Sequence, residues 1–208
     1  MSTIKTKTNR ELFLEKLAPH ISVFGMERVY DAYMFAKYAH KQQYRTGGGR
    51  YFEHPRAVAE IIINELGIVN DWKVVSQALL HDVLEDTWLL TPKLAEKTFG
   101  KDISHGLSLL TRGEEHSNAE FAAYVGAIAE SGLWRVILVK LCDRLHNLRT
   151  MNEFSIERQK RYIRETEEHF SLLFRAFSLF VPRRFAKKAI VLKQLFASEM
   201  QNAKARAS

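Results

Sequence analysis

The chain has 208 residues with 46% hydrophobic content, which is enough to bury the core of one domain. Its single cysteine, Cys142, excludes an internal disulfide framework, and no apolar run reaches the ~20 residues of a membrane span. The formal charge of +7 favours an anionic partner, but zinc-finger spacing and the aromatic strand pattern of common RNA-binding modules are absent from the sequence. We therefore expect one soluble, cytoplasmic domain over residues 1–208, with a small anionic ligand and neither nucleic acid nor a membrane as partner.

Helical periodicity runs through nearly the whole chain, and alternating β-branched runs are short. Thr91 followed by Pro92 predicts a helix start, and Gly67, Gly100 and Gly132 stand where helices are expected to stop. The predicted helices span residues 9–18, 25–43, 55–66, 72–86, 91–98, 101–111, 117–131, 133–151, 155–178 and 183–201. This pattern predicts an all-α bundle of about nine to ten helices.

Between the second and third predicted helices lies a glycine-rich segment, Gly47-Gly48-Gly49, flanked by Arg45 and Arg50. Glycines allow sharp turns and a close approach of backbone to a ligand, although the spacing of a P-loop is missing. A plain connector and an anion contact both fit the glycines, and the two arginines favour the contact.

The stretch from His81 to Asp86 contains four side chains that can bind a metal or transfer a proton: His81, Asp82, Glu85 and Asp86. On an α-helix they would lie within about 140° of one another, opposite an apolar face. Three carboxylates this close repel one another, so they cost stability unless a cation neutralises them. A solvated acidic face is the alternative, but the apolar flanking residues favour a buried helix and a metal site.

Residues 136–150 form a second two-faced helix, whose polar side carries Lys140, Asp143, Arg144, Asn147 and Thr150. Asp143 in isolation would pair with Lys140 or Arg144. Because another helix is rich in carboxylates that need a cation, a role for Asp143 as a metal ligand is the favoured interpretation.

His54 precedes Pro55, so a helix is expected to begin just after it. A lone histidine is usually a packed or solvated residue. Together with His81, Asp82 and Asp143, however, it completes a set of two nitrogen and two oxygen ligands that suits Mn, Fe or Zn.

The ordered set His54, His81-Asp82 and Asp143 resembles the HD superfamily of metal-dependent phosphohydrolases. The strings AHKQQYRTGGGRYFEHP at 39–55, ALLHDVLEDT at 78–87 and VILVKLCDRLHNLRTM at 136–151 are similar to the hydrolase domain of RelA/SpoT homologues, over about residues 25–155. Those enzymes remove pyrophosphate from the alarmone (p)ppGpp. The resemblance implies an HD-domain helical bundle with a helical extension over about residues 155–208, as in a stand-alone small alarmone hydrolase.

The resemblance also implies roles for individual residues. In the family a metal, usually Mn²⁺, is held at the positions of His54, His81, Asp82 and Asp143, and the attacking water is handled at those of Glu85 and Asp86. The positions of Arg45, Asn147 and Thr150 contribute to the nucleoside pocket. Lys140 and Arg144 are expected to offset the charge of the substrate.

This chain departs from the family pattern beside the nucleoside pocket. Thr46 stands where the family often has a lysine. The family often has Gly-Glu-Pro-Tyr where this chain has Gly48-Gly49-Arg50-Tyr51. The expected reaction is hydrolysis of the 3′-pyrophosphate of (p)ppGpp to GDP or GTP and pyrophosphate, while these departures leave the preference for guanine over adenine open. The alternatives are an HD phosphohydrolase of another nucleotide such as (p)ppApp, or a non-enzymatic metal-binding sensor or antitoxin-like partner. Glu85 and Asp86 favour an enzyme, because a binding module has little use for them.

The tail from about residue 155 is amphipathic, with Phe170, Leu173, Phe174, Phe177 and Phe180 on or near one face. This face fits packing against the domain, and it also fits a homo-oligomer.

Overall fold

The computed structural model describes residues 7–113 and 117–207, and all regular elements in these ranges are helical. The α-helices are α1 (Asn9–Glu15), α2 (Val23–Ala39), α3 (Glu53–Glu60), α4 (Trp72–Leu80), α5 (Val83–Asp86), α6 (Pro92–Phe99), α7 (Lys101–Leu110), α8 (Asn118–Glu130), α9 (Trp134–Thr150), α10 (Ile156–Phe180) and α11 (Ala186–Ala207). The shorter segments are the π-helix η1 (Ile61–Glu65) and the 3₁₀ turns η2 (Met151–Glu153) and η3 (Arg183–Phe185). The predicted all-α class is confirmed.

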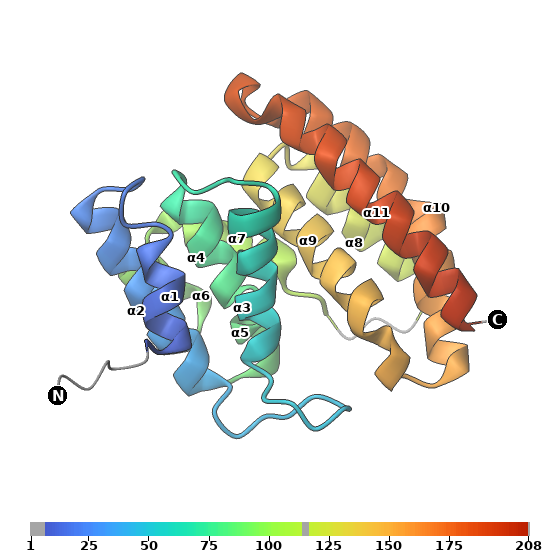
Figure 1. Ribbon diagram of the computed structural model, residues 1–208, viewed down its shortest axis with the longest axis horizontal. Coiled ribbons are helices and arrows are strands. Elements are labelled where there is room, and N and C mark those ends of the chain that lie inside the picture. Colours follow the sequence, from blue (N-terminus) through green and yellow to red (C-terminus); the bar gives the residue numbers. More distant parts are fainter. Residues whose placement is uncertain (1–6, 114–116, 208) are drawn as a thin grey trace, which may run out of the picture.

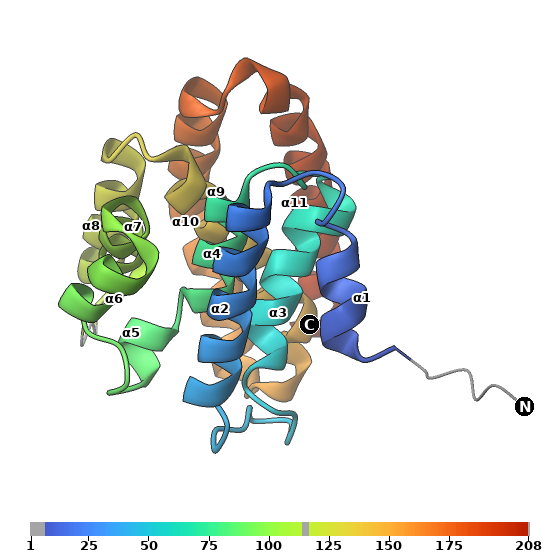
Figure 2. The same ribbon diagram turned by 90° about the vertical axis from the view of Figure 1, so that its left-hand side faces the viewer.

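Helix α9 lies in the middle of the molecule (Figure 1). It packs against α3, α4 and α7 on one side and against α8, α10 and α11 on the other. The long helices α10 and α11 form a hairpin along one edge (Figure 1). In both views the loop that joins α2 to α3 lies below the ends of α2 and α3 (Figures 1 and 2). Residues from distant parts of the chain therefore meet around α9.

Local sequence signals account for most helix ends. Thr91 caps α6 by accepting a hydrogen bond from the Leu94 amide, with Pro92 in the first turn as predicted. Gly67, Gly100 and Gly132 have positive φ angles of 60°, 92° and 64°, which glycine adopts without steric cost. The expected helix stops at these three glycines are confirmed.

The predicted helix over residues 72–86 is wrong at one point, because the structure breaks it between α4 and α5 at His81 and Asp82. The His81 imidazole donates from Nδ1 to the carbonyl oxygen of Ala78 at 2.8 Å, and the next turn restarts with the Asp86 amide donating to Asp82. A continuous helix would hold adjacent side chains about 100° apart. The break allows the His81 and Asp82 side chains to face the same point.

Other boundaries also differ from the prediction. Helix α3 begins at Glu53, so His54 lies in its first turn, where Pro55 costs no hydrogen bond. Its last turns widen into a π-helix, in which Leu66 donates to the carbonyl of Ile61. Helix α2 ends at Ala39, short of the predicted residue 43, and the chain then enters the glycine-rich loop.

The aromatic face of the C-terminal tail packs within the domain. Phe170, Leu173 and Phe177 are buried where α10 meets α8, α9 and α11, whereas Phe180 is 43% exposed. Cys142 is fully buried in α9, where it packs in the core. Among the described helices, none combines the length and apolar character needed to span a bilayer.

Candidate metal centre and adjoining cleft

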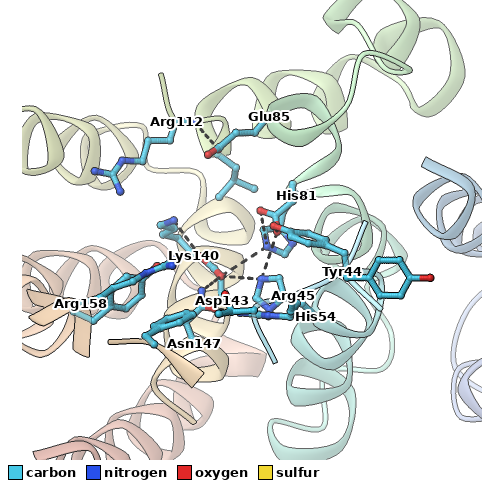
Figure 3. A pocket seen from close by; sticks show the side chains of 16 residues that line it. Tyr44, Arg45, His54, His81, Glu85, Arg112, Lys140, Asp143, Asn147 and Arg158 are labelled. Carbon is cyan, nitrogen blue, oxygen red and sulfur yellow. Dashed lines mark hydrogen bonds and ion pairs between the residues drawn. The ribbon is translucent and has the colours of Figure 1, made fainter. Parts of the chain in front are cut away.

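His54, His81 and Asp143 form a buried cluster in which one ligand atom from each lies within 4.8 Å of the others. Nε2 of His54 is 3.2 Å from Oδ1 of Asp143, and Nε2 of His81 is 3.8 Å from the same oxygen. Asp82 closes the group, since its carboxylate oxygens lie 3.0 Å from Nε2 of His81 and 3.4 Å from Nε2 of His54. The structure therefore brings together all four residues predicted as metal ligands, from α3, the α4–α5 break and α9. Figure 3 shows His54, His81 and Asp143 side by side.

The donor atoms of this cluster fit a divalent cation. His81 donates from Nδ1 to a backbone carbonyl, which leaves Nε2 as a lone-pair donor. That Nε2 is buried and has no hydrogen-bond partner among the described residues. A buried nitrogen acceptor facing carboxylates is costly when unsatisfied, and a metal ion satisfies both. The cluster could thus hold one divalent metal.

The electrostatics of the cluster describe how it balances charge without a metal. Burial lowers the pKa of His54, despite the nearby carboxylates of Asp143 and Asp82. Burial acts on His81 in the same direction, but Asp82 and Asp143 outweigh it and raise its pKa to about 9. The rings of His54 and His81 are only 5.2 Å apart, so two imidazolium charges would repel. Without a metal, the raised pKa favours a second proton on Nε2 of His81, facing Asp82, and a bound metal would displace that proton.

Asp143 is held in its ionised form by its neighbours. Burial alone would raise the pKa of Asp143, but the Lys140 ammonium, His54 and His81 hold it well below its ordinary value. Nζ of Lys140 lies 3.0 Å from Oδ2 of Asp143, so the two carboxylate oxygens face different partners. A carboxylate that stays ionised at all working pH values is a suitable metal ligand.

Two residues outside the predicted set support the ligands. Nδ1 of His146 lies 2.8 Å from Nδ1 of His54, and the Tyr51 hydroxyl donates to Oδ2 of Asp82 at 3.0 Å. Burial lowers the pKa of His146 to about 3, with the neighbouring His54 acting in the same direction. His146 is therefore neutral, and its Nδ1 can accept a hydrogen bond from the Nδ1–H of His54. That hydrogen bond leaves Nε2 of His54 as a lone-pair donor aimed at the cluster.

The predicted site missed these two supporting residues, although both stand inside the motifs that carry the family resemblance. Tyr51 is three residues before His54, and His146 is three residues after Asp143. The spacing of His146 places it beside the polar face of α9, which is the one signal that could have identified it. Tyr51 lies in a loop, where no periodicity predicts the direction of a side chain.

The cluster lies at the wall of a cavity of about 310 Å³ whose lining is strongly polar. Arg45, Lys140 and Asn147 from the predicted substrate set line it. Nη2 of Arg45 donates to Oδ1 of Asn147 at 2.8 Å, whereas Nη1 of Arg45 is buried and lacks a partner among the described residues. This orphaned donor is available to a ligand at one end of the cavity.

The glycine-rich loop is pinned beside this end of the cavity. The Gly47 amide donates to Oε2 of Glu153 at 3.1 Å, and a Cβ added at Gly47 would collide with that carboxylate. A side chain at position 47 would therefore displace the exposed Glu153 carboxylate from this hydrogen bond. Arg50 does not line the cavity, but pairs by backbone with Tyr44 in an isolated β-bridge.

The two acidic residues predicted to handle water are placed differently. Glu85 lines the cavity, and its Oε2 accepts a hydrogen bond from the Arg112 amide at 2.8 Å. Burial raises the pKa of Glu85, with Asp82 and Asp86 adding to the effect. Asp86 does not line the cavity, and together with Asp82 it raises the pKa of the buried Tyr51 hydroxyl. Glu85 is thus placed to contact a ligand, whereas Asp86 is not.

Two residues of the predicted substrate set lie outside the cavity, which corrects their assignment. Arg144 is 4% exposed, donates to the Glu165 carboxylate at 3.3 Å and stacks against Phe121 and Phe170, so it is part of the contact between α9 and α10. The Thr150 hydroxyl donates to the backbone carbonyl of His146 at 3.1 Å. The helical wheel gave Arg144 the correct face, but that side of α9 is covered by α10.

An all-α bundle with a buried His–His–Asp–Asp cluster beside a basic cleft is an arrangement for holding a divalent metal against an anionic ligand. A family model described as HD domain matches residues 32–176, and the chain belongs to this family. The resemblance seen in the sequence motifs is thereby confirmed.

The chain is also similar in sequence to curated proteins of known name. The chain is 38% identical over 156 residues to the bifunctional (p)ppGpp synthase/hydrolase SpoT of Escherichia coli strain K12, covering 71% of this chain and 21% of the relative. It is 36% identical over 167 residues to a probable guanosine-3′,5′-bis(diphosphate) 3′-pyrophosphohydrolase of Synechocystis, covering 76% of this chain and 20% of the relative. The chain therefore spans about a fifth of the length of these relatives.

The fold is similar to that of a solved structure, over nearly the whole length of the solved chain. It is described as a metazoan orthologue of SpoT that hydrolyses ppGpp and plays a role in starvation responses. The two share 25% sequence identity with a TM-score of 0.65, over 82% of this chain and 94% of that one. The arrangement of helices around the candidate site is thus that of a known fold.

Proposed function

We propose that this protein is a metal-dependent hydrolase that removes the 3′-pyrophosphate of (p)ppGpp, giving GDP or GTP and pyrophosphate. The observation that carries the proposal is the buried cluster of His54, His81, Asp82 and Asp143 at the wall of a basic cavity. Similarity to a (p)ppGpp synthase/hydrolase, to a probable (p)ppGpp pyrophosphohydrolase and to a ppGpp-hydrolysing orthologue of SpoT supports the substrate class.

The four clustered residues are proposed to hold the metal, with Mn²⁺ as the family precedent. When bound, a divalent metal lowers the pKa of water and polarises phosphoryl oxygens. Hard and borderline donors such as imidazole and carboxylate suit Mn²⁺, whereas the only cysteine is buried in α9 and offers no thiolate.

The side chains of the cavity are proposed to act on different parts of the substrate. Arg45 and Asn147 contact the base at one end through the orphaned Nη1 and the Asn147 amide. Lys140 stays charged, because Tyr124 and Asp143 outweigh the burial that would lower its pKa, and it faces the phosphates. The absence of lysine at position 46 leaves Arg45 as the cation on the base side of the described cavity.

Hydrolysis adds a water oxygen to the 3′-linked phosphorus and breaks its bond to the 3′-oxygen of the ribose. Glu85 lines the cavity as a carboxylate, so it is the proposed acceptor of the water proton. The leaving 3′-oxygen takes up one proton, and pyrophosphate departs. Tyr51 and His146 are proposed to hold Asp82 and His54 in position through their hydrogen bonds.

The test is pyrophosphate release from (p)ppGpp with Mn²⁺ added and then chelated. Asp82→Ala and Asp143→Ala should abolish both metal binding and release, because each removes a ligand of the cluster. Glu85→Ala should retain metal binding, measured by calorimetry, and lower kcat about 100-fold or more. Normal turnover in all three variants would contradict the proposal.

The base preference is settled in the same assay by including the adenine counterpart, (p)ppApp. Thr46 lines the base end of the cavity in place of the frequent lysine, so both bases are tested with equal 5′-phosphate chains. Release only from the adenine series would replace the guanine assignment while leaving the reaction unchanged.

A further inference from the structure

We propose that a second cavity, lined by arginines and contiguous with the metal cleft, binds the outer phosphates of the substrate's 5′-phosphate chain. The enzyme would then favour a 5′-triphosphate over a 5′-monophosphate. This inference rests on the proposed function and deepens it. This arginine cavity has a volume of about 570 Å³ and is lined by Arg158, Arg161 and Arg164 of α10.

The arginine cavity continues the metal cleft, because Arg112, Arg158 and Tyr162 line both. In Figure 3, Arg112 and Arg158 lie on the opposite side of the Lys140–Asp143 pair from Tyr44. A nucleotide with its base beside Tyr44 and its reacting phosphate at the centre would therefore extend toward these arginines.

The volumes of the two cavities support such an extension. The metal cleft, at about 310 Å³, is at the lower end of the range of about 300–1,000 Å³ for small-molecule sites. A nucleoside with phosphate chains on both its 3′ and 5′ oxygens needs more room than the cleft offers. The contiguous arginine cavity supplies that room on the side lined with cations.

The three arginines of α10 repel one another, and a bound anion would reduce that repulsion. Arg158, Arg161 and Arg164 follow one another at three-residue intervals on α10, and like charges at this spacing destabilise a helix. Glu165 is the one acidic residue lining the cavity within the described ranges. Its carboxylate is already shared between Arg144 at 3.3 Å and Arg161 at 3.7 Å.

Of these three arginines, Arg164 has the fewest side-chain interactions within the protein. Its side chain makes no hydrogen bond or ion pair with any residue in 7–113 or 117–207, whereas the Arg158 guanidinium lies 3.8 Å from the centre of the Phe154 ring. Arginine offers planar, paired N–H donors that match phosphate oxygens. A chain of phosphates, with several charges in a row, is the ligand that a row of guanidinium groups recognises.

The simplest competing explanation is that these exposed arginines are solvated and only contribute general positive charge. General charge would act equally on any anion and from any position on α10. A contact in the arginine cavity would act only on the length of the 5′ chain. Variants that remove equal charge inside and outside the cavity separate the two explanations.

The test compares Arg161→Ala/Arg164→Ala with Lys160→Ala/Arg175→Ala. The control removes two exposed charges from the same helix, at positions that do not line the arginine cavity. KM and kcat are measured with Mn²⁺ for substrates that carry the same 3′-pyrophosphate and a 5′-mono-, di- or triphosphate.

Wild-type protein and the control should show the lowest KM for the 5′-triphosphate. The cavity variant should raise that KM about tenfold, leave KM for the 5′-monophosphate within about twofold and leave kcat unchanged. Equal effects in both double variants, or a wild-type KM independent of chain length, would overturn the inference and leave the proposed hydrolase intact.

A binding measurement decides the inference independently of turnover. Inorganic tripolyphosphate is titrated calorimetrically into the Mn²⁺-loaded full chain at about 0.15 M salt, where general surface attraction is screened. The affinity should fall about tenfold in the cavity variant and remain unchanged in the control. If no nucleotide is hydrolysed, the proposed function fails, and equal tripolyphosphate affinity in all three proteins would reject the arginine cavity separately.

Discussion

His146 and His54 meet nitrogen to nitrogen beneath the metal cluster, and this 2.8 Å contact fixes which nitrogen of His54 faces the cluster. A neutral imidazole can donate from only one ring nitrogen. With His146 accepting at Nδ1, the proton of His54 is held on the side away from Asp82 and Asp143. His146 is therefore a positioning residue that acts through His54.

His146→Leu should weaken metal affinity about 10- to 100-fold while the protein stays folded, because supporting hydrogen bonds of this kind set ligand orientation. His146→Gln keeps an acceptor near Nδ1 of His54 and should lose less. Calorimetric titration with Mn²⁺ measures both, and circular dichroism checks the fold. Equal affinity in wild type and His146→Leu would show that His54 needs no such partner.

Glu85 should impose an acidic limb on the pH profile of kcat. The group acts as an ionised carboxylate, so activity falls as the pH drops through its pKa. Burial, with Asp82 and Asp86 nearby, raises that pKa above its ordinary value of 4.5. Activity should therefore decline at a higher pH than an exposed glutamate would produce. The residual activity of Glu85→Gln should lack this limb, and a limb at the same pH in that variant would assign it to another group.

At the scale of single elements, helix α9 has two polar sides, of which one lines the cleft and the other packs against α10. One side carries Asp143, Lys140 and Asn147 into the cleft. On the other, Arg144 is enclosed by α10 and paired with Glu165. The polar stripe that reads as one binding surface in the sequence is thus divided between a ligand site and a helix contact.

Arg144→Ala should destabilise the fold by about 3–5 kcal/mol, because it leaves the Glu165 carboxylate buried with only the exposed Arg161 as partner. Chemical denaturation measures the loss. Metal affinity and KM of the folded fraction should remain those of wild type. A raised KM with unchanged stability would instead return Arg144 to the substrate site.

Periodicity and caps predicted the helices of this fold, because each depends on residues a few positions apart. The break between α4 and α5 was not predictable in this way, since it depends on His81 donating to Ala78 and on a cluster assembled with α3 and α9. Burial by a distant helix likewise removed Arg144 from the site. Residue types and motif order thus predicted residues that cluster in the structure, whereas the contacts of Tyr51 and His146 required the tertiary structure.

At the scale of the whole molecule, the metal cluster joins three parts of the chain. His54 belongs to α3, His81 and Asp82 to the turn after α4, and Asp143 to α9. An ion held by all of them binds the folded chain and has no comparable site in the unfolded one.

Mn²⁺ at about 100 times its dissociation constant should therefore stabilise the protein by about 2.7 kcal/mol. The rise in Tm on adding Mn²⁺, and its reversal by a chelator, measures the effect. Asp143→Asn is the control, and only its metal-induced shift is compared, because the change also deprives Lys140 of its buried partner. The same shift in wild type and Asp143→Asn would place the ion elsewhere.

One chain of hydrogen bonds links Arg45 to the metal-binding cluster. Arg45 donates to Oδ1 of Asn147, and the amide nitrogen of Asn147 donates to Oδ1 of Asp143 at 2.7 Å. The side chains proposed to contact the nucleobase are consequently in direct contact with an acid proposed to bind the ion. If occupancy at one site changes affinity at the other, thermodynamic reciprocity requires the same factor in both directions. Exchanging one purine for another would therefore alter how firmly the protein retains its metal.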